Sequence, residues 1–114
     1  MNWGKVIYIF FALMSLTTIA GFLYDQNDVA LFVAACVNLI STLLKIGVRN
    51  FLAAELFASS LVADLHLIPA FAITQINPEA SVMVYTLAIG ALLANIFSMI
   101  LVIVDSVKNI EDDN

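Results

Sequence analysis

The chain has 114 residues, of which 63% are hydrophobic and 11% are charged, and its formal net charge is −5. With a mean hydropathy of +1.06, a soluble domain of this size would expose far too much apolar surface, so the lipid bilayer is the expected solvent. The acidic balance argues against nucleic acid as a partner, and the single cysteine excludes an internal disulfide and a cysteine-based metal cluster.

Four apolar windows are long enough to cross a bilayer as helices. They cover residues 6–24, 29–48, 51–73 and 81–104. The connections between them are short, which makes neighbouring helices run antiparallel. We therefore predict an all-α polytopic membrane protein: a single domain, residues 1–114, with four transmembrane helices in an up-down antiparallel bundle and a short acidic tail at 105–114.

The basic residues all fall on one side of this bundle. They are Lys5, Lys45, Arg49 and Lys108. The turns at 25–28 and 74–80, which lie on the opposite side, contain no Lys or Arg. Because cytoplasmic loops are enriched in basic residues, we predict that both termini face the cytoplasm.

Polar residues from all four helices fall at about the same depth when the chain is folded about its turns. They are Ser15, Asn38, Ser59 or Ser60, and Asn95. Hydrogen bonds between such groups hold transmembrane helices together, so a packing belt is one interpretation. A hydrated constriction lined by the same groups is the other.

The second window carries its polar residues on one stripe. At about 100° per residue, Asn38, Ser41, Thr42, Lys45 and Arg49 occupy a narrow sector, which predicts a face that meets protein or water and not lipid. Lys45 and Arg49 lie near the cytoplasmic surface. They are interpreted either as topology anchors that extend to the interface, or as a basic cytoplasmic mouth or lipid-phosphate site.

The third window is polar on two faces. Glu55, Ser59 and His66 share one side, whereas Asp64 points about 180° away from Glu55. A Lys45–Glu55 ion pair would neutralise both charges. His66 is interpreted as a hydrogen-bonded packing residue or as a proton relay.

Asp64 lies near the middle of its window, where a charge costs at least about 2.5–3.5 kcal/mol. Counting from the turns places it level with Thr18 and with small residues that offer no cation. Three explanations stay open: a protonated Asp64 that bonds to Thr18 or to a backbone carbonyl, a site on a water-filled path that binds a cation or proton, and a contact with another subunit.

Two stretches carry a resemblance to a known family. The chain begins Met-Asn-Trp-Gly-Lys and holds Glu-Leu-Phe-Ala-Ser-Ser-Leu-Val-Ala-Asp-Leu-His at 55–66. In both it is similar to an uncharacterised family of small four-span bacterial inner-membrane proteins. The resemblance implies a multi-pass protein of the bacterial inner membrane and carries over no function. The length also resembles the small multidrug transporters, whose first helix carries an embedded Glu; residues 6–24 contain no acid.

Two classes of function follow from these residues. The first is a homo-oligomeric ion channel or transporter for a small cation or proton. Its expected pathway residues are Asp64, Glu55, His66, Asn38, Ser59 and Asn95, with Lys45 and Arg49 at the mouth. The second is a non-transporting scaffold or accessory subunit of a larger membrane complex. One small bundle offers too little interior for the polar belt, both polar faces of the third window and the small residues, so we expect a homo-oligomer or another membrane subunit. We expect no enzyme activity, cofactor or metal, because no catalytic set converges at one depth.

Overall fold

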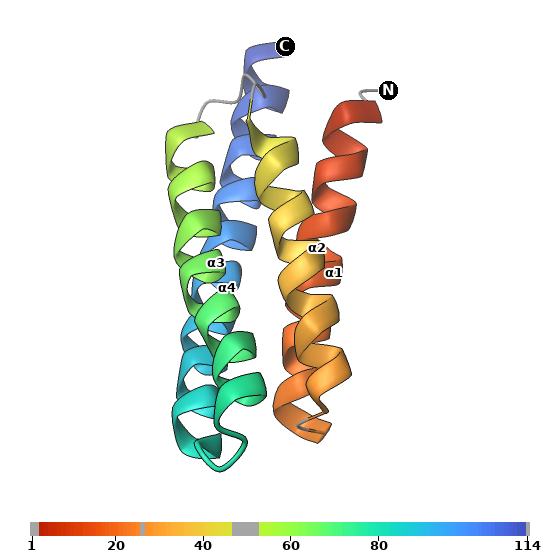
Figure 1. The fold of residues 1–114 in the computed structure, drawn as a ribbon. Coiled ribbons are helices and arrows are strands. Elements are labelled where there is room, and N and C mark those ends of the chain that lie inside the picture. The colour runs from red at the N-terminus through yellow and green to blue at the C-terminus, as the bar shows by residue number, and fades with distance from the viewer. Residues whose placement is uncertain (1–2, 26, 47–52, 114) are drawn as a thin grey trace.

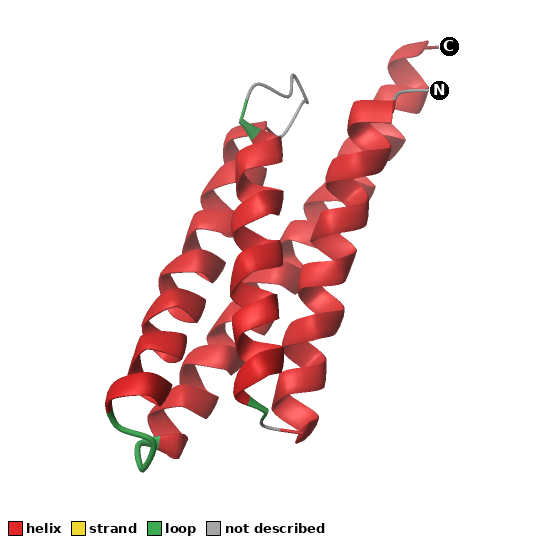
Figure 2. Ribbon diagram, turned by 45° about the vertical axis from the view of Figure 1, so that its right-hand side comes forward, coloured by secondary structure: helices red, strands yellow, loops and turns green. Residues whose placement is uncertain are grey.

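The computed structural model of the chain describes residues 3–25, 27–46 and 53–113, and these are helical apart from short turns (Figures 1 and 2). The four helices are α1 (Trp3–Asp25), α2 (Asp28–Lys45), α3 (Ala53–Ile76) and α4 (Ser81–Asp113). The described part of the chain contains no strand. The predicted all-α fold is therefore confirmed.

The helices form a ring in which each packs against two others. α1 and α3 both contact α2 and α4, so α2 and α4 lie between them on opposite sides. Successive helices run antiparallel, and the two termini lie at the same end of an elongated bundle of 54 × 23 × 20 Å (Figure 1). This is the up-down topology that short connections impose.

All four helices are long and apolar enough to cross a membrane. Their outward faces carry large apolar side chains, for example Leu43, Leu65 and Leu93, which are 64%, 71% and 62% exposed. Such a surface is stable in lipid and not in water. The helices therefore indicate a multi-pass membrane protein.

Most helix ends differ from the prediction by one to three residues, and the ends of α2 and α4 are the informative cases. α2 begins after the N-cap Asn27, whose Oδ1 accepts a hydrogen bond of 2.8 Å from the Val29 amide. It ends at Lys45, and the predicted remainder reaches into residues 47–52, which lie outside the described residues. α4 continues to Asp113, so the segment predicted as a tail is helical there. Residues 105–113 contain no Gly or Pro to end the helix.

Two apolar layers pack inside the bundle. The larger layer surrounds Ile19, Leu31 and Leu67, all fully buried, in the half that contains the turns at 25–28 and 74–80. A smaller layer of Tyr8, Leu56 and Val102 lies toward the end where the termini meet. Polar side chains are buried between these layers, and they form the candidate site.

Candidate functional site

Polar side chains from α1, α2, α3 and α4 meet at one level inside the bundle. Ser15 donates a hydrogen bond of 2.5 Å to Asn38 Oδ1, and Asn95 Nδ2 donates one of 2.9 Å to Ser15 Oγ. Asn38 Nδ2 also lies 3.4 Å from the Ser60 carbonyl oxygen. These contacts confirm the predicted common depth of the four helices' polar residues.

Asp64 belongs to the same network and is only 5% exposed. Its Oδ1 accepts a hydrogen bond from Asn38 Nδ2, and its Oδ2 accepts one of 2.7 Å from Thr42 Oγ1. The carboxyl group therefore has two donors from α2. Hydrogen bonds to a carboxylate are among the stronger ones in proteins, which offsets part of its burial cost.

The expected contact between Asp64 and Thr18 is wrong. The Thr18 hydroxyl bonds instead to carbonyl oxygens of its own helix, at 2.8 Å to Met14 and 3.0 Å to Ser15. Counting from the turns fixes the depth of a residue only to within about one helical turn, and it does not show which face of the neighbouring helix is nearest. Asp64 is buried inside its own bundle, so its hydrogen bonds are satisfied without a contact to another subunit.

The polar stripe of α2 faces the interior, as predicted. Asn38 and Ser41 are each 1% exposed, while Thr42 and Lys45 are each 5% exposed. The spacing of three and four residues places all of them on one face of the helix. α2 therefore turns its polar side inward and its apolar side to the surroundings.

Lys45, the last residue of α2, is directed into the bundle and is only 5% exposed. Its Nζ donates a hydrogen bond to Ser60 Oγ, and it is close enough to Asp64 for the two charges to attract each other. The expected surface anchor, lipid-phosphate contact and Glu55 pair are therefore wrong for Lys45, because the residue continues the inward stripe of α2. Arg49 lies outside the described residues.

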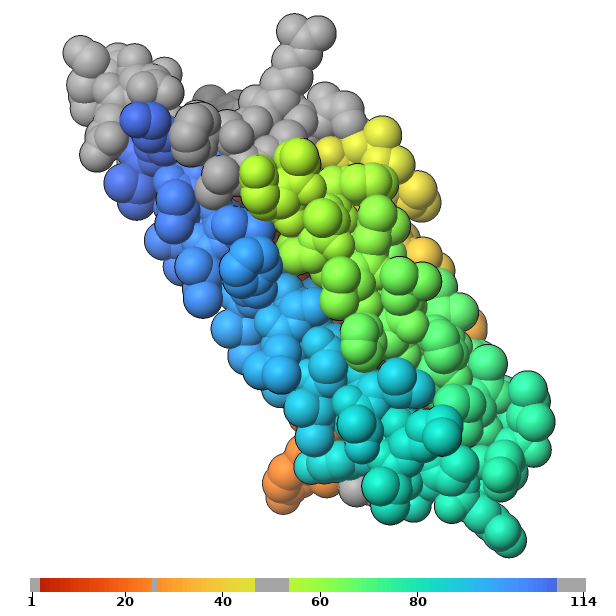
Figure 3. All heavy atoms as spheres, turned by 90° about the vertical axis from the view of Figure 1, so that its left-hand side faces the viewer, coloured from red at the N-terminus to blue at the C-terminus, as the bar shows by residue number. Residues whose placement is uncertain are grey.

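The opposite face of α3 borders a separate groove between α3 and α4, on the side viewed in Figure 3. Glu55, Ser59 and His66 all line this groove, which has a volume of about 570 Å³. Their predicted common side is confirmed. Glu55 is exposed there, and the Ser59 hydroxyl bonds to the Ser98 hydroxyl of α4. The groove is lined mainly by apolar and small side chains.

His66 is held by its own helix and by α4. Its Nδ1 lies 2.7 Å from the Val62 carbonyl oxygen, which only accepts hydrogen bonds, so Nδ1 carries the proton. The ring rests on Gly90, where a Cβ atom would lie 2.5 Å from His66 Cδ2. The absence of a side chain at Gly90 therefore makes room for the imidazole, and the packing interpretation of His66 accounts for both contacts.

The six expected pathway residues divide into two groups. Asp64, Asn38 and Asn95 are joined in the buried network, whereas Glu55, Ser59 and His66 lie on the groove side of α3. The groups are separated because opposite faces of one helix cannot meet.

The expected pathway residues left out several buried polar side chains, among them Ser15, Thr42, Ser60 and Asp105. The polar belt and the stripe of α2 contained the signals for the first three. Asp105 is fully buried on α4, beyond the point where the apolar window ends, and the sequence alone gave no reason to place it inside.

One chain buries the network without help from a partner. Among the described residues, every buried side-chain nitrogen or oxygen has a hydrogen-bond partner. The network itself therefore needs no second subunit, whereas Glu55 on the other face of α3 stays exposed in the groove, and a homo-oligomer stays a prediction. The described residues also contain no group of three or more His, Cys, Asp and Glu side chains placed to hold a metal ion.

The chain belongs to the family of unknown function DUF6394, whose family model matches residues 25–106. The matched region includes α2 and α3 completely and most of α4. It therefore contains every residue of the network except Ser15. No curated protein and no solved structure matches the chain. Membership agrees with the resemblance to a family without an assigned function, and it supplies no activity.

Proposed function

We propose that this member of DUF6394 is an ion channel or transporter for a proton or small cation, and that Asp64 holds the transported species. The observation that carries the proposal is the pair of hydrogen bonds between Thr42 and its neighbours. The Thr42 hydroxyl lies 2.7 Å from Asp64 Oδ2 and 2.9 Å from the Asn38 carbonyl oxygen. A hydroxyl has a single proton, so it donates to one of these acceptors at a time.

This geometry serves both protonation states of Asp64. When Asp64 is ionised, the Thr42 hydroxyl donates to its carboxylate. When Asp64 carries a proton, it donates to Thr42 Oγ1, and the Thr42 hydroxyl donates to the Asn38 carbonyl. Neither state leaves a buried polar group without a partner, which would otherwise cost about 1–3 kcal/mol. Asp64 can therefore take up and release a proton in place.

A line of polar groups connects the site with the end of the bundle where the termini lie. Lys45 is the last residue of α2 and bonds to Ser60, and the Ser60 carbonyl accepts from Asn38, which bonds to Asp64. Toward the other end, the fully buried side chains of Ile19, Leu31 and Leu67 form an apolar barrier. This arrangement favours a transporter or gated channel over an open pore, because the barrier must move before an ion crosses.

The alternative function is a non-transporting scaffold or accessory subunit. The completely hydrogen-bonded interior favours it, because a network that ties four helices together is sufficient reason for the buried polar groups. In that case the groove between α3 and α4 would receive a second copy or another membrane subunit. The homo-oligomer, the location in the bacterial inner membrane with cytoplasmic termini, and the absence of enzyme activity are parts of our proposal.

Proteoliposome flux separates the two functions. We expect the wild type to carry protons or a monovalent cation above the rate of protein-free liposomes. Asp64→Asn keeps the shape but cannot ionise, so it should abolish the flux, and Thr42→Val should slow it. Glu55→Gln is the matched control, because it neutralises another membrane-embedded acid outside the network. Folded wild-type protein without any flux would support the scaffold, and an unchanged rate in Asp64→Asn would refute the role of Asp64.

A further inference from the structure

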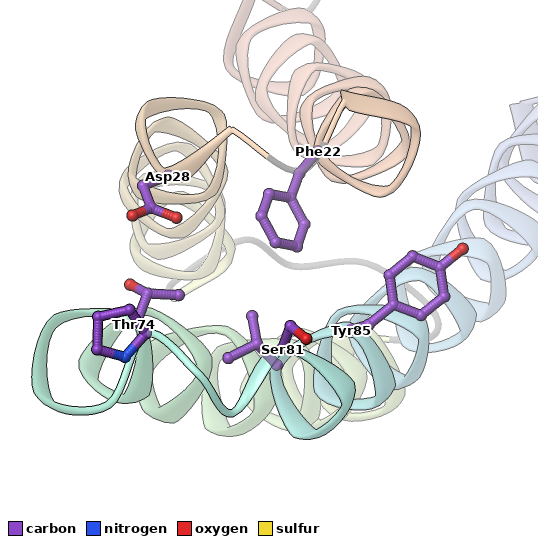
Figure 4. A pocket seen from close by; sticks show the side chains of 7 residues that line it. Phe22, Asp28, Thr74, Ser81 and Tyr85 are labelled. Atoms are coloured by element: carbon purple, nitrogen blue, oxygen red, sulfur yellow. The ribbon is translucent and has the colours of Figure 1, made fainter.

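A second cavity lies at the end of the bundle opposite the termini, beyond the apolar barrier. It has a volume of about 220 Å³. All four helices contribute to its wall, together with the turn between α3 and α4. The lining residues are Phe22, Asp28, Thr74, Pro78, Ser81, Val84 and Tyr85. Figure 4 looks onto this cavity, with the ring of Phe22 directed into the space between the helices.

The lining combines one carboxylate, three hydroxyl groups and two aromatic rings with the apolar side chains of Pro78 and Val84. Asp28, the first residue of α2, supplies the negative charge. The Thr74 hydroxyl donates a hydrogen bond of 2.6 Å to the Phe71 carbonyl and accepts one of 3.4 Å from Gln75 Nε2, so its oxygen keeps one further lone pair that can accept a bond. The ring of Phe22 is directed into the cavity, and the ring of Tyr85 lies at its edge with the hydroxyl directed away, so both residues offer aromatic surface to a cation (Figure 4).

The electrostatic surroundings of the cavity also favour a cation. The turns at 25–28 and 74–80 contain acidic residues and no Lys or Arg. Two helices begin and two helices end here, so their opposite dipoles largely cancel, and the side-chain charges determine the electrostatic potential. An anion would find no positive partner among the lining residues.

We propose that this cavity binds a small organic ammonium ion. The Asp28 carboxylate would neutralise the charge, the aromatic rings would contact the alkyl groups and the cation, and the Thr74 and Ser81 hydroxyls would accept N–H bonds from a primary amine. A bare metal ion fits less well, because the lining offers one carboxylate and neutral hydroxyl groups where hard cations prefer several carboxylate and carbonyl oxygens. The site does not depend on Asp64, since the apolar barrier separates the two.

Calorimetric titration of the purified protein with tetramethylammonium chloride tests the proposal. A neutral maltoside micelle is the appropriate environment, because the choline head groups of phosphatidylcholine would compete. Sodium chloride of equal ionic strength and the neutral molecule tert-butanol serve as ligand controls. We expect saturable binding of tetramethylammonium by the wild type and none of tert-butanol.

Three variants assign the binding to the cavity. Asp28→Asn should weaken it about tenfold through the lost charge, and Tyr85→Leu about threefold through the lost cation–π contact. Asp25→Asn is the matched control, because it removes the same charge from the same end of the bundle without lining the cavity. We expect it to bind as the wild type does.

Each other result overturns the proposal. If the wild type shows no saturable binding, the cavity is not a binding site. If Asp25→Asn and Asp28→Asn lose affinity equally, the binding comes from the general negative potential of this end of the bundle and not from the cavity. Far-UV circular dichroism checks that each variant folds. If Asp28→Asn fails to fold, the affinity of Tyr85→Leu decides, because a value equal to that of the wild type is incompatible with the cavity. Since no flux is measured, the outcome is independent of the proposal for Asp64.

Discussion

Asn38 is the hub of the buried network, and replacing it by alanine should destabilise the bundle strongly. Its side chain accepts from Ser15 and donates to Asp64 and to the Ser60 carbonyl. Interhelical hydrogen bonds in membranes contribute about 0.6–1.7 kcal/mol each, and a bond to a charged group lies at the upper end. For three lost bonds we expect the free energy of unfolding to fall by about 2–4 kcal/mol.

Reversible unfolding by dodecyl sulfate in mixed micelles, followed by circular dichroism, measures this change. Leu39→Ala is the matched control: it lies next in the chain, its side chain is 39% exposed on the lipid side, and it makes no contact with the network. The control should cost less than about 1 kcal/mol, because an exposed side chain leaves no cavity when it is shortened.

Part of the expected loss comes from Asp64, which is left with one donor in place of two. The cost of Asn38→Ala should therefore be at least about 1 kcal/mol smaller in an Asp64→Ala background. Equal costs in both backgrounds would show that the two side chains do not interact. A cost of Asn38→Ala no greater than that of Leu39→Ala would refute the structural role of the network.

Three further predictions concern other parts of the molecule. Gly90→Ala should lower the free energy of unfolding by about 1–3 kcal/mol, because the added Cβ displaces the His66 ring, and the double variant with His66→Ala should regain most of this loss. Gly21→Ala is the control and should not destabilise, because no atom lies within 4 Å of its added Cβ. Equal unfolding midpoints for the two glycine variants would contradict the packing of His66 on Gly90. Lys45→Gln removes the cation near Asp64 and the hydrogen bond to Ser60, and should cost about 1–3 kcal/mol, partly restored in Lys45→Gln/Asp64→Asn. A double variant less stable than either single one would argue against their attraction. A fluorescent protein fused to the C-terminus should fold and fluoresce in cells, while a periplasmic phosphatase at the same position should be inactive; the reverse pattern would invert the predicted topology.

The architecture could be predicted because each of its causes is local in the sequence. Apolar windows of about 20 residues define transmembrane helices. The turns at 25–28 and 74–80 are so short that the two helices joined by each must lie side by side and antiparallel. The same reasoning aligned Ser15, Asn38 and Asn95 in depth, because antiparallel helices that share a turn have a fixed register. The stripe of α2 and the two faces of α3 followed from helical periodicity alone.

Partners across helices depended on information that periodicity does not contain. The rotation of each helix about its axis and the ring order of the four helices bring Thr42 and Lys45 toward α3 and leave Thr18 bonded to its own helix. These quantities are set by how all side chains pack together, so no single window specifies them. For that reason the Lys45–Glu55 pair and the Asp64–Thr18 bond, which was one of the open explanations, are not formed, although Ser15, Asn38 and Asn95 were aligned correctly in depth.

The sequence by itself determined the solvent of this protein, the number and order of its helices and the level at which its polar groups meet. Only the tertiary structure decided that Asp64 bonds to Asn38 and Thr42, that Lys45 turns inward, and that Asp28 and Phe22 share a cavity at the opposite end. The physical reason is that hydropathy and helical period act along one chain segment. Hydrogen-bond pairing and cavities arise between segments, where the packing of the whole bundle selects one arrangement.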